Sequence, residues 1–148
     1  MVEQGLEHSE FRALADFRYL IRRFLHFSEN AARAEGLEPQ QHQTLLAIRA
    51  SGDPGGPTVG ELAGQLLIRH HSAVGLLDRL EERGMVRRTR GAGDRREVRI
   101  RLTDAGARKL ERLSGAHRAE LANLHPALVE SLAVLLPAVD AVPRGDRK

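Results

Sequence analysis

The sequence predicts a mainly α-helical protein that carries one small β-hairpin, and two observations predict this fold class. Apolar residues recur at helical spacing through most of the 148 residues. Between Glu97 and Leu102 the pattern changes to a strict apolar–polar alternation, which is typical of a half-buried strand. Because hydrophobic residues make up 41% of the chain, we expect a folded core. The length fits one compact domain, or one domain plus helical extensions.

The first predicted helix covers residues 11–35, which hold all five aromatic residues of the chain. Gly36 is expected to end this helix. Pro39 suits the first turn of a second helix, which we expect to run to Ser51. The apolar stripe of the first helix is wide and consists of Phe11, Leu14, Phe17, Leu20, Ile21, Phe24, Leu25 and Phe27.

Two shorter helices are predicted after the turn-rich segment "SGDPGGP", residues 51–57. Thr58 and Glu61 have the spacing of a capping box, so a third helix is expected to begin here. A break at residues 67–69 separates it from a fourth helix over residues 70–83. The apolar positions are Val59, Leu62, Ala63 and Leu66 in the third helix and Ala73, Leu76, Leu77 and Leu80 in the fourth.

The hairpin is predicted from "EVRIRL", in which Val98, Ile100 and Leu102 share one face of a strand. The preceding "MVRRTR" is expected to be its partner strand, so residues 91–96 form the tip. Downstream, Thr103 can cap a fifth helix, and Pro126 is expected to separate it from a last helix.

Composition excludes several classes of protein. The chain has no cysteine, which excludes disulfides, cysteine-ligated zinc, iron–sulfur clusters and a thiol redox switch. No apolar run approaches the roughly 20 residues that a membrane span requires. The N-terminus "MVEQGLEHSEF" lacks the basic start and apolar centre of a signal peptide, so we expect a cytoplasmic protein.

Positive charge is concentrated in one segment. The net charge is +3, yet Arg83–Arg101 holds eight arginines against Asp94 and Glu97, a local charge of +6, so the remaining residues sum to −3. A basic segment on a mildly acidic body is typical of a surface that binds nucleic acid. A solvated charged face is the alternative interpretation.

Two short helices followed by an arginine-rich hairpin predict a winged helix-turn-helix. A helix fits the major groove of B-DNA, and the hairpin, or wing, can reach the neighbouring minor groove, where arginine is favoured. The small residues Gly91, Ala92 and Gly93 allow the wing tip to turn tightly close to DNA.

Residues 58–106 resemble the MarR family of bacterial transcriptional regulators, through the segments "LDRLEERGMV", "GDRR" and "LTDAG". The resemblance implies a homodimeric repressor that binds a pseudo-palindromic operator and is released by a small-molecule effector. It also implies an N-terminal dimerisation helix in residues 1–36, a DNA-binding region in 37–103 and C-terminal dimerisation helices in 104–148.

The same resemblance implies which residues contact DNA. The recognition helix would contribute Arg69, His70, His71, Ser72, Gly75 and Arg79, and the wing would contribute Arg88, Arg90, Asp94, Arg95 and Arg96. In the family, the arginine of the Asp-x-Arg motif enters the minor groove, and here this is Arg96, with Arg95 as the alternative. The start of the recognition helix departs from the commoner family pattern, so the operator sequence does not transfer from relatives.

Ligand binding would involve other residues. Tyr19, Phe24 and Phe27 are candidates for an effector pocket, because family members bind amphipathic compounds beside these helices; core and dimer packing is the alternative. His26, His42 and His117 would have to converge with Glu35 or Glu38 to hold a metal, so a metal-responsive regulator remains an alternative.

No catalytic grouping or cofactor site is predicted. The tip "GAGDRR" lacks the lysine of a phosphate-binding loop and lies between two strands, not between a strand and a helix. A winged-helix module for protein interaction is the other alternative, although its strands would be more apolar than "RRTR" and "VRIR".

Overall fold

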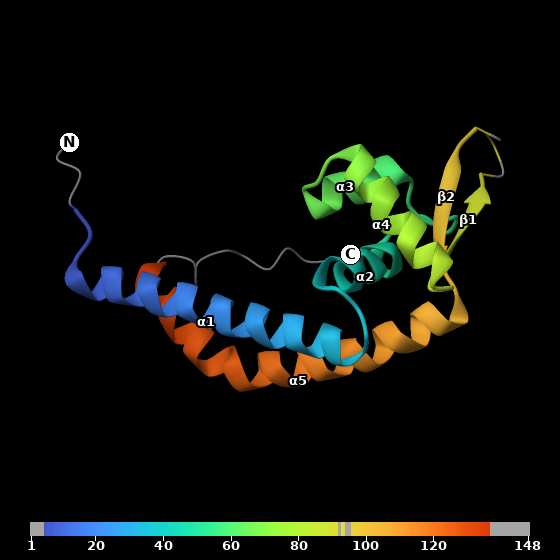
Figure 1. Ribbon diagram of the computed structural model, residues 1–148. Helices are drawn as coiled ribbons and strands as arrows, with labels where there is room; N and C mark the ends of the chain where they lie inside the picture. Colours follow the sequence, from blue (N-terminus) through green and yellow to red (C-terminus); the bar gives the residue numbers. More distant parts are fainter. Residues whose placement is uncertain (1–4, 92, 94–95, 137–148) are drawn as a thin grey trace, which may run out of the picture. The chain divides into compact units, whose positions relative to one another are not determined.

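The computed structural model describes residues 5–91, 93 and 96–136, in which five helices and one two-stranded antiparallel sheet form (Figure 1). The predicted fold class is confirmed. In chain order the elements are α1 (His8–Ala34), α2 (Pro39–Ala50), α3 (Val59–Leu66), α4 (His70–Glu82), β1 (Val86–Arg90), β2 (Val98–Leu102) and α5 (Asp104–Leu135).

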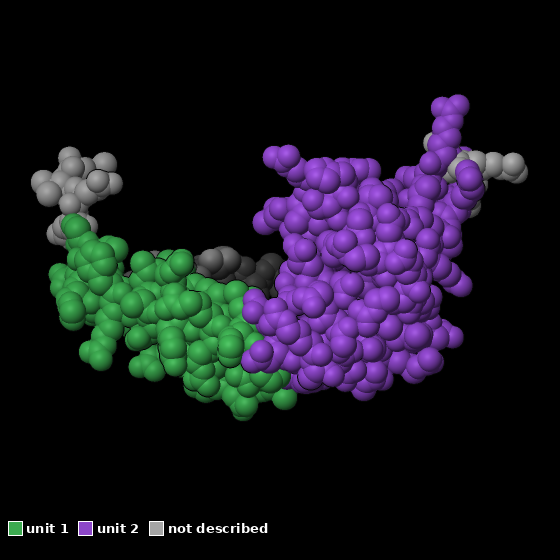
Figure 2. Space-filling view, in the orientation of Figure 1, with its two compact units in different colours: residues 1–27, 117–148 green, residues 28–116 purple. Residues whose placement is uncertain are grey.

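The chain divides into two compact units (Figure 2). The first unit contains residues 1–27 and 117–148, and the second contains residues 28–116. In the first unit, Ala13 and Leu20 of α1 and Leu124 of α5 are buried. The second unit holds all of α2, α3, α4 and the sheet, and its core is made of Ala32, Leu37, Leu45, Ile48, Leu62, Leu77, Leu80, Met85, Val86, Ile100, Leu110 and Leu113.

The ends of α1 and α4 share one geometry. Gly36 has a φ of 76° and donates its backbone N–H to the carbonyl of Arg33 at 2.9 Å, while Leu37 donates to Ala32 at 2.9 Å. Gly84 repeats this arrangement after α4 with a φ of 71°. Each glycine therefore closes its helix with two backbone hydrogen bonds, at a left-handed position that other residues rarely adopt.

The predicted caps are present. Thr58 accepts a hydrogen bond from the backbone of Glu61 at 3.2 Å, and the Glu61 carboxylate accepts from the backbone of Thr58 at 2.9 Å. At the start of α5, Thr103 Oγ1 accepts from Gly106 at 3.1 Å and donates to the carbonyl of Gly84 at 2.6 Å. Thr103 therefore joins α5 to the turn that follows α4.

Pro126 does not end α5, which corrects the sequence-based expectation of a separate last helix. The helix continues without interruption to Leu135. A proline inside a helix removes one backbone hydrogen bond and bends the axis, but packing on both sides can hold the helix together. Leu124 and Ser131 are both buried, so the two halves share one packed side across the proline.

The sheet has the expected strands and a neighbour that was not expected. Arg87 pairs with Arg101 and Arg88 pairs with Ile100. The segment before α3 runs along the outer edge of β2, because Ile100 donates its N–H to the carbonyl of Pro57 at 2.9 Å and Thr58 forms a bridge with Arg99.

Candidate nucleic-acid interface

Helix α4 has one buried side and one exposed side. The four predicted apolar positions, Ala73, Leu76, Leu77 and Leu80, are all buried. Its exposed residues include His70, His71, Ser72 and Arg79, with Gly75 partly exposed. The structure therefore brings all the predicted recognition-helix residues onto the accessible part of one helix and the residue before it, Arg69.

The start of α4 lacks the side-chain cap that α3 has. Arg69 occupies the cap position with an extended backbone and makes no side-chain hydrogen bond to the helix. The first backbone N–H groups of a helix need acceptors, and they attract phosphate oxygens. The beginning of α4 is therefore suited to lie against a DNA backbone.

The turn before α4 is strained. Leu67 has a φ of 55°, a left-handed conformation that leucine rarely adopts, and its side chain is 93% exposed. The N–H of the next residue, Ile68, donates to the carbonyl of Ala63 at 3.0 Å, which closes α3. The left-handed residue thus reverses the chain between the two helices and leaves an apolar side chain at the surface.

The C-terminal half of α4 is acidic on its exposed side, a feature that the sequence analysis missed. Asp78 and Glu82 lie close to the direction of His71 and Gly75, since residues three, four and seven positions apart share a helix face. The Glu82 carboxylate would repel a DNA phosphate, whereas Asp78 is paired with Arg88 at 2.7 Å. An approaching duplex would therefore meet the N-terminal half of the helix.

Arg88 is held by acidic side chains of α4. Its guanidinium donates to Asp78 at 2.7 Å and to Glu81 at 2.9 Å. Burial acts to lower the pKa of Arg88, but the hydrogen bonds and charges of Asp78 and Glu81 outweigh it and raise the pKa. Arg88 is thus engaged in fixing β1 to α4, although it was predicted to contact DNA.

Arg99 joins the hairpin to the segment before α3. Its side chain is only 16% exposed and contacts Asp53 at 3.0 Å and Glu97 at 2.9 Å. The hydrogen bond with Glu97 is the main cause that raises the pKa of Arg99; burial opposes it, and the charge of Asp53 adds to it. Val98, predicted to face inward, is exposed, because it lies near the tip, beyond the core under Ile100.

The remaining wing residues lie toward the tip. Arg90 and Arg96 are both exposed. The backbone of Gly91 donates to the carbonyl of Glu97 at 2.9 Å and closes the base of the tip. The predicted contacts Asp94 and Arg95 lie outside the described residues.

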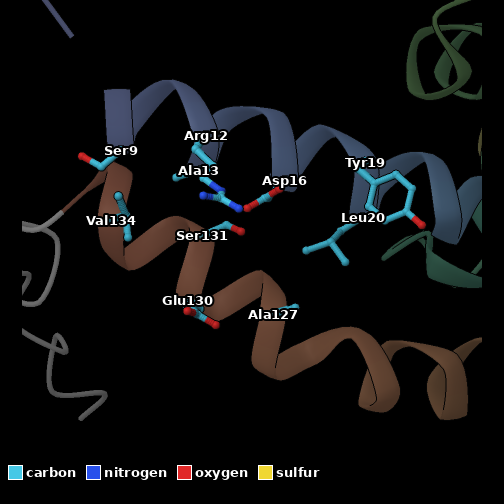
Figure 3. Close-up of a pocket in the computed structure, with 10 residues that line it drawn as sticks. All are labelled: Ser9, Arg12, Ala13, Asp16, Tyr19, Leu20, Ala127, Glu130, Ser131 and Val134. Atoms are coloured by element: carbon cyan, nitrogen blue, oxygen red, sulfur yellow. The ribbon is translucent and has the colours of Figure 1, made fainter. Parts of the chain in front are cut away.

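The candidate effector residues fall into two groups in the first unit. Tyr19 lines a cavity of about 550 Å³ between the N-terminal part of α1 and the C-terminal part of α5 (Figure 3). Its polar lining includes Ser9, Arg12, Asp16, Glu130 and Ser131. Phe24 and Phe27 do not line this cavity, and both contact the ring of His117 edge-on, at 5.7 and 5.6 Å between centroids.

The described residues contain neither a candidate metal-binding group nor a candidate membrane-spanning helix. Across these parts of the chain, no three histidine, aspartate or glutamate side chains converge in a group that would hold a metal ion. Within the same residues, no helix combines the length and the apolar character needed to cross a membrane.

Residues 35–97 match the model of the MarR family. The HTH-type transcriptional regulator PecS of Dickeya dadantii is 33% identical over 81 residues, which cover 55% of this chain and 49% of PecS. The chain therefore spans about half the length of this relative. The family match contains the helix-turn-helix and strand β1 of the wing, and it ends just before β2.

Solved structures show the same fold over a larger part of the chain. AbsC, a MarR family transcriptional regulator from Streptomyces coelicolor, has a TM-score of 0.69 at 21% identity and covers 97% of this chain and 99% of its own. A mutant of MarR from E. coli, complexed with operator DNA, has a TM-score of 0.62 at 24% identity. It covers 82% of this chain and 89% of its own. At these identities the likeness concerns the fold.

Proposed function

We propose that the chain is a winged helix-turn-helix transcriptional regulator of the MarR family, whose model residues 35–97 match, and that it represses transcription as a homodimer on a pseudo-palindromic operator. In this proposal the chain acts as a regulator and not as an enzyme, because the family that it matches consists of regulators. In the proposal, residues 37–103 bind DNA, and residues 1–36 and 104–148 form the dimer, which works in the cytoplasm beside the chromosome.

One observation supports DNA binding above the others: the way charge is distributed over α4. Arg69, His70, His71 and Ser72 stand together at an uncapped helix start, while the acidic residues are confined to the other half. A major groove accepts such a helix end, and arginine, histidine and serine side chains can bond base edges or phosphates. The E. coli MarR mutant, which has the same fold, is complexed with operator DNA, and this supports DNA binding by the fold.

The dimer is supported by the apolar surface of the first unit. Large apolar side chains that are exposed there include Phe11, Leu14, Tyr19, Ile21, Leu25, Leu121, Val129, Leu132, Val134 and Leu136. A monomer rarely leaves so many on one pair of helices. A second copy covering this surface would present two α4 helices to successive major grooves, with half-site centres about 34–36 Å apart.

Repression would follow from occupancy, since a dimer on the operator blocks access to the promoter. A small-molecule effector would favour a dimer in which the two α4 helices no longer match the groove spacing. Such coupling is typically about 1–3 kcal/mol. The cavity beside Tyr19 and the ring cluster of Phe24, Phe27 and His117 are the two places where this effector would bind.

Titration of labelled duplex DNA by fluorescence anisotropy tests the interface. Arg96→Ala is expected to weaken binding to a selected operator by about 1–3 kcal/mol while the mass in solution stays unchanged. Arg69→Ala is expected to relax sequence preference more than it weakens non-specific binding. Arg108→Ala removes an exposed arginine of α5 and is the control, with no expected change. Equal affinities for all three variants would contradict a DNA contact by Arg96 and by Arg69.

A further inference from the structure

The arginines of the hairpin belong to two groups that the sequence does not distinguish. Arg88 and Arg99 each contact two or more carboxylates, so their charges are balanced within the protein. Arg87 has no carboxylate partner among the described residues, and Arg101 donates only to the backbone carbonyl of Pro54, at 2.6 Å. The charges of Arg87 and Arg101 are therefore left unbalanced.

The pairing of the strands brings the unbalanced charges of Arg87 and Arg101 close together, which is unfavourable. Arg87 lies directly opposite Arg101, and like charges at directly paired positions of antiparallel strands repel each other. Both side chains lie on the side of the sheet away from Arg88, because successive residues of a strand alternate. Since Arg88 reaches α4 through Asp78, the side with Arg87 and Arg101 faces away from the recognition helix.

Arg49 adds a third positive charge beside Arg87 and Arg101. A cleft of about 250 Å³ is lined by Arg49 at the end of α2, by Arg87 and Arg101, and by Ser51 and Asp53 of the following segment. Arg49 is exposed and, within the described part of the chain, has no carboxylate partner. Three guanidinium groups from α2, β1 and β2 thus border one cleft.

The one carboxylate of the cleft is already engaged. Asp53 Oδ2 lies 3.0 Å from Arg99 Nη1, and Asp53 Oδ1 accepts the backbone N–H of Gly55 at 2.7 Å. Its charge therefore balances Arg99, which does not line this cleft. The three arginines that do line it have no matching negative charge there.

We propose that Arg49, Arg87 and Arg101 form a binding site for a small anion that carries a phosphate or carboxylate group. Guanidinium groups bind both groups through paired hydrogen bonds, and an anion between Arg87 and Arg101 would relieve their repulsion. The cleft is smaller than the roughly 300–1,000 Å³ of pockets for drug-sized ligands, so the anion is compact. Bound there, it would join α2 to both strands of the wing.

Calorimetric titration of the whole protein without DNA tests this site, with pyrophosphate and citrate as probes at constant ionic strength. At least one probe is expected to bind saturably. The double variant Arg87→Gln/Arg101→Gln should raise its dissociation constant roughly tenfold or more, because two charge-assisted contacts are lost. Arg49→Gln should raise it less. The control Arg22→Gln/Arg108→Gln removes the same charge from exposed positions on α1 and α5 and should leave it unchanged.

Two outcomes would overturn the proposal. Binding that does not saturate, or that weakens equally in the control, would mean that the anions respond only to overall charge. The second outcome is read from binding to duplex DNA at several salt concentrations. If neither probe binds and the double variant lowers the salt dependence by about two phosphate contacts, the cleft holds the DNA backbone instead. Anion binding is measured without DNA. The proposed anion site would therefore still hold if the proposed regulatory function failed.

Discussion

Gly75 lies on the proposed DNA-binding face of α4, although glycine is unfavourable inside a helix. Glycine inside a helix destabilises it by about 1 kcal/mol relative to alanine. Nothing in the fold requires glycine here, because an added Cβ would meet only the guanidinium of Arg79, at 4.0 Å. Packing therefore does not account for the glycine, whereas the DNA contact proposed for this face would.

Gly75→Ala is expected to raise the stability of the protein by up to about 1 kcal/mol and to weaken operator binding. Thermal unfolding and anisotropy titration measure the two effects. Gly64→Ala is the matched control, since Gly64 lies in α3 and a Cβ there would meet no atom within 4 Å. Operator affinity that is equal in the two variants would contradict a close approach at Gly75.

The hairpin arginines also show what a sequence can predict at single residues. The cluster of positive charge was evident, but the partners of Arg88 and Arg99 were not. Asp78 and Glu81 contact Arg88 only because of how α4 is rotated against β1, and Asp53 is 46 positions from Arg99. Such contacts depend on tertiary packing and leave no periodic pattern in the sequence.

At the scale of elements, the sequence predicted a helix end correctly where specific residues cap the helix. Gly36 and the Thr58–Glu61 capping box lie where they were expected. Pro126 was misinterpreted because burial of Leu124 and Ser131 on either side outweighs the local preference of proline. The pairing of Pro57 with β2 was missed because a segment rich in glycine and proline shows no strand alternation.

The junction between the wing and α5 depends on a close contact of backbones. A Cβ on Gly106 would lie 2.1 Å from the carbonyl oxygen of Met85, and backbone atoms cannot move aside cheaply. Gly106→Ala is therefore expected to destabilise the protein by about 1–3 kcal/mol.

Gly115→Ala in the same helix is the control for this junction. A Cβ there meets no atom within 4 Å, so the substitution is expected to stabilise the protein by up to about 1 kcal/mol. Denaturant unfolding of both variants measures the difference. A Gly106→Ala protein as stable as the Gly115→Ala protein would refute the close contact.

At the scale of the whole molecule, the proposed operator binding depends on a second copy covering the first unit. Leu132 is 38% exposed on α5 among the apolar residues described above. Leu132→Asp would bury a charge at the proposed interface, so we expect the mass in solution to fall to that of a monomer and operator affinity to be lost.

Ser114→Asp adds the same charge at an exposed position of α5 within the second unit and serves as the control. It is expected to keep both the dimer and the operator affinity. A Leu132→Asp protein that remains dimeric, or that binds a palindrome with full affinity as a monomer, would contradict the proposed assembly.

The most direct test of operator binding by a dimer is a selection of random duplex DNA with the purified protein at two salt concentrations, together with its mass in solution. We expect a dimer to enrich one palindromic sequence and its binding to weaken steeply with salt, because arginines replace the counterions of the phosphates. Weak binding without enrichment of any sequence would contradict the proposed repressor and would leave the wing and α4 as a charged surface without an operator.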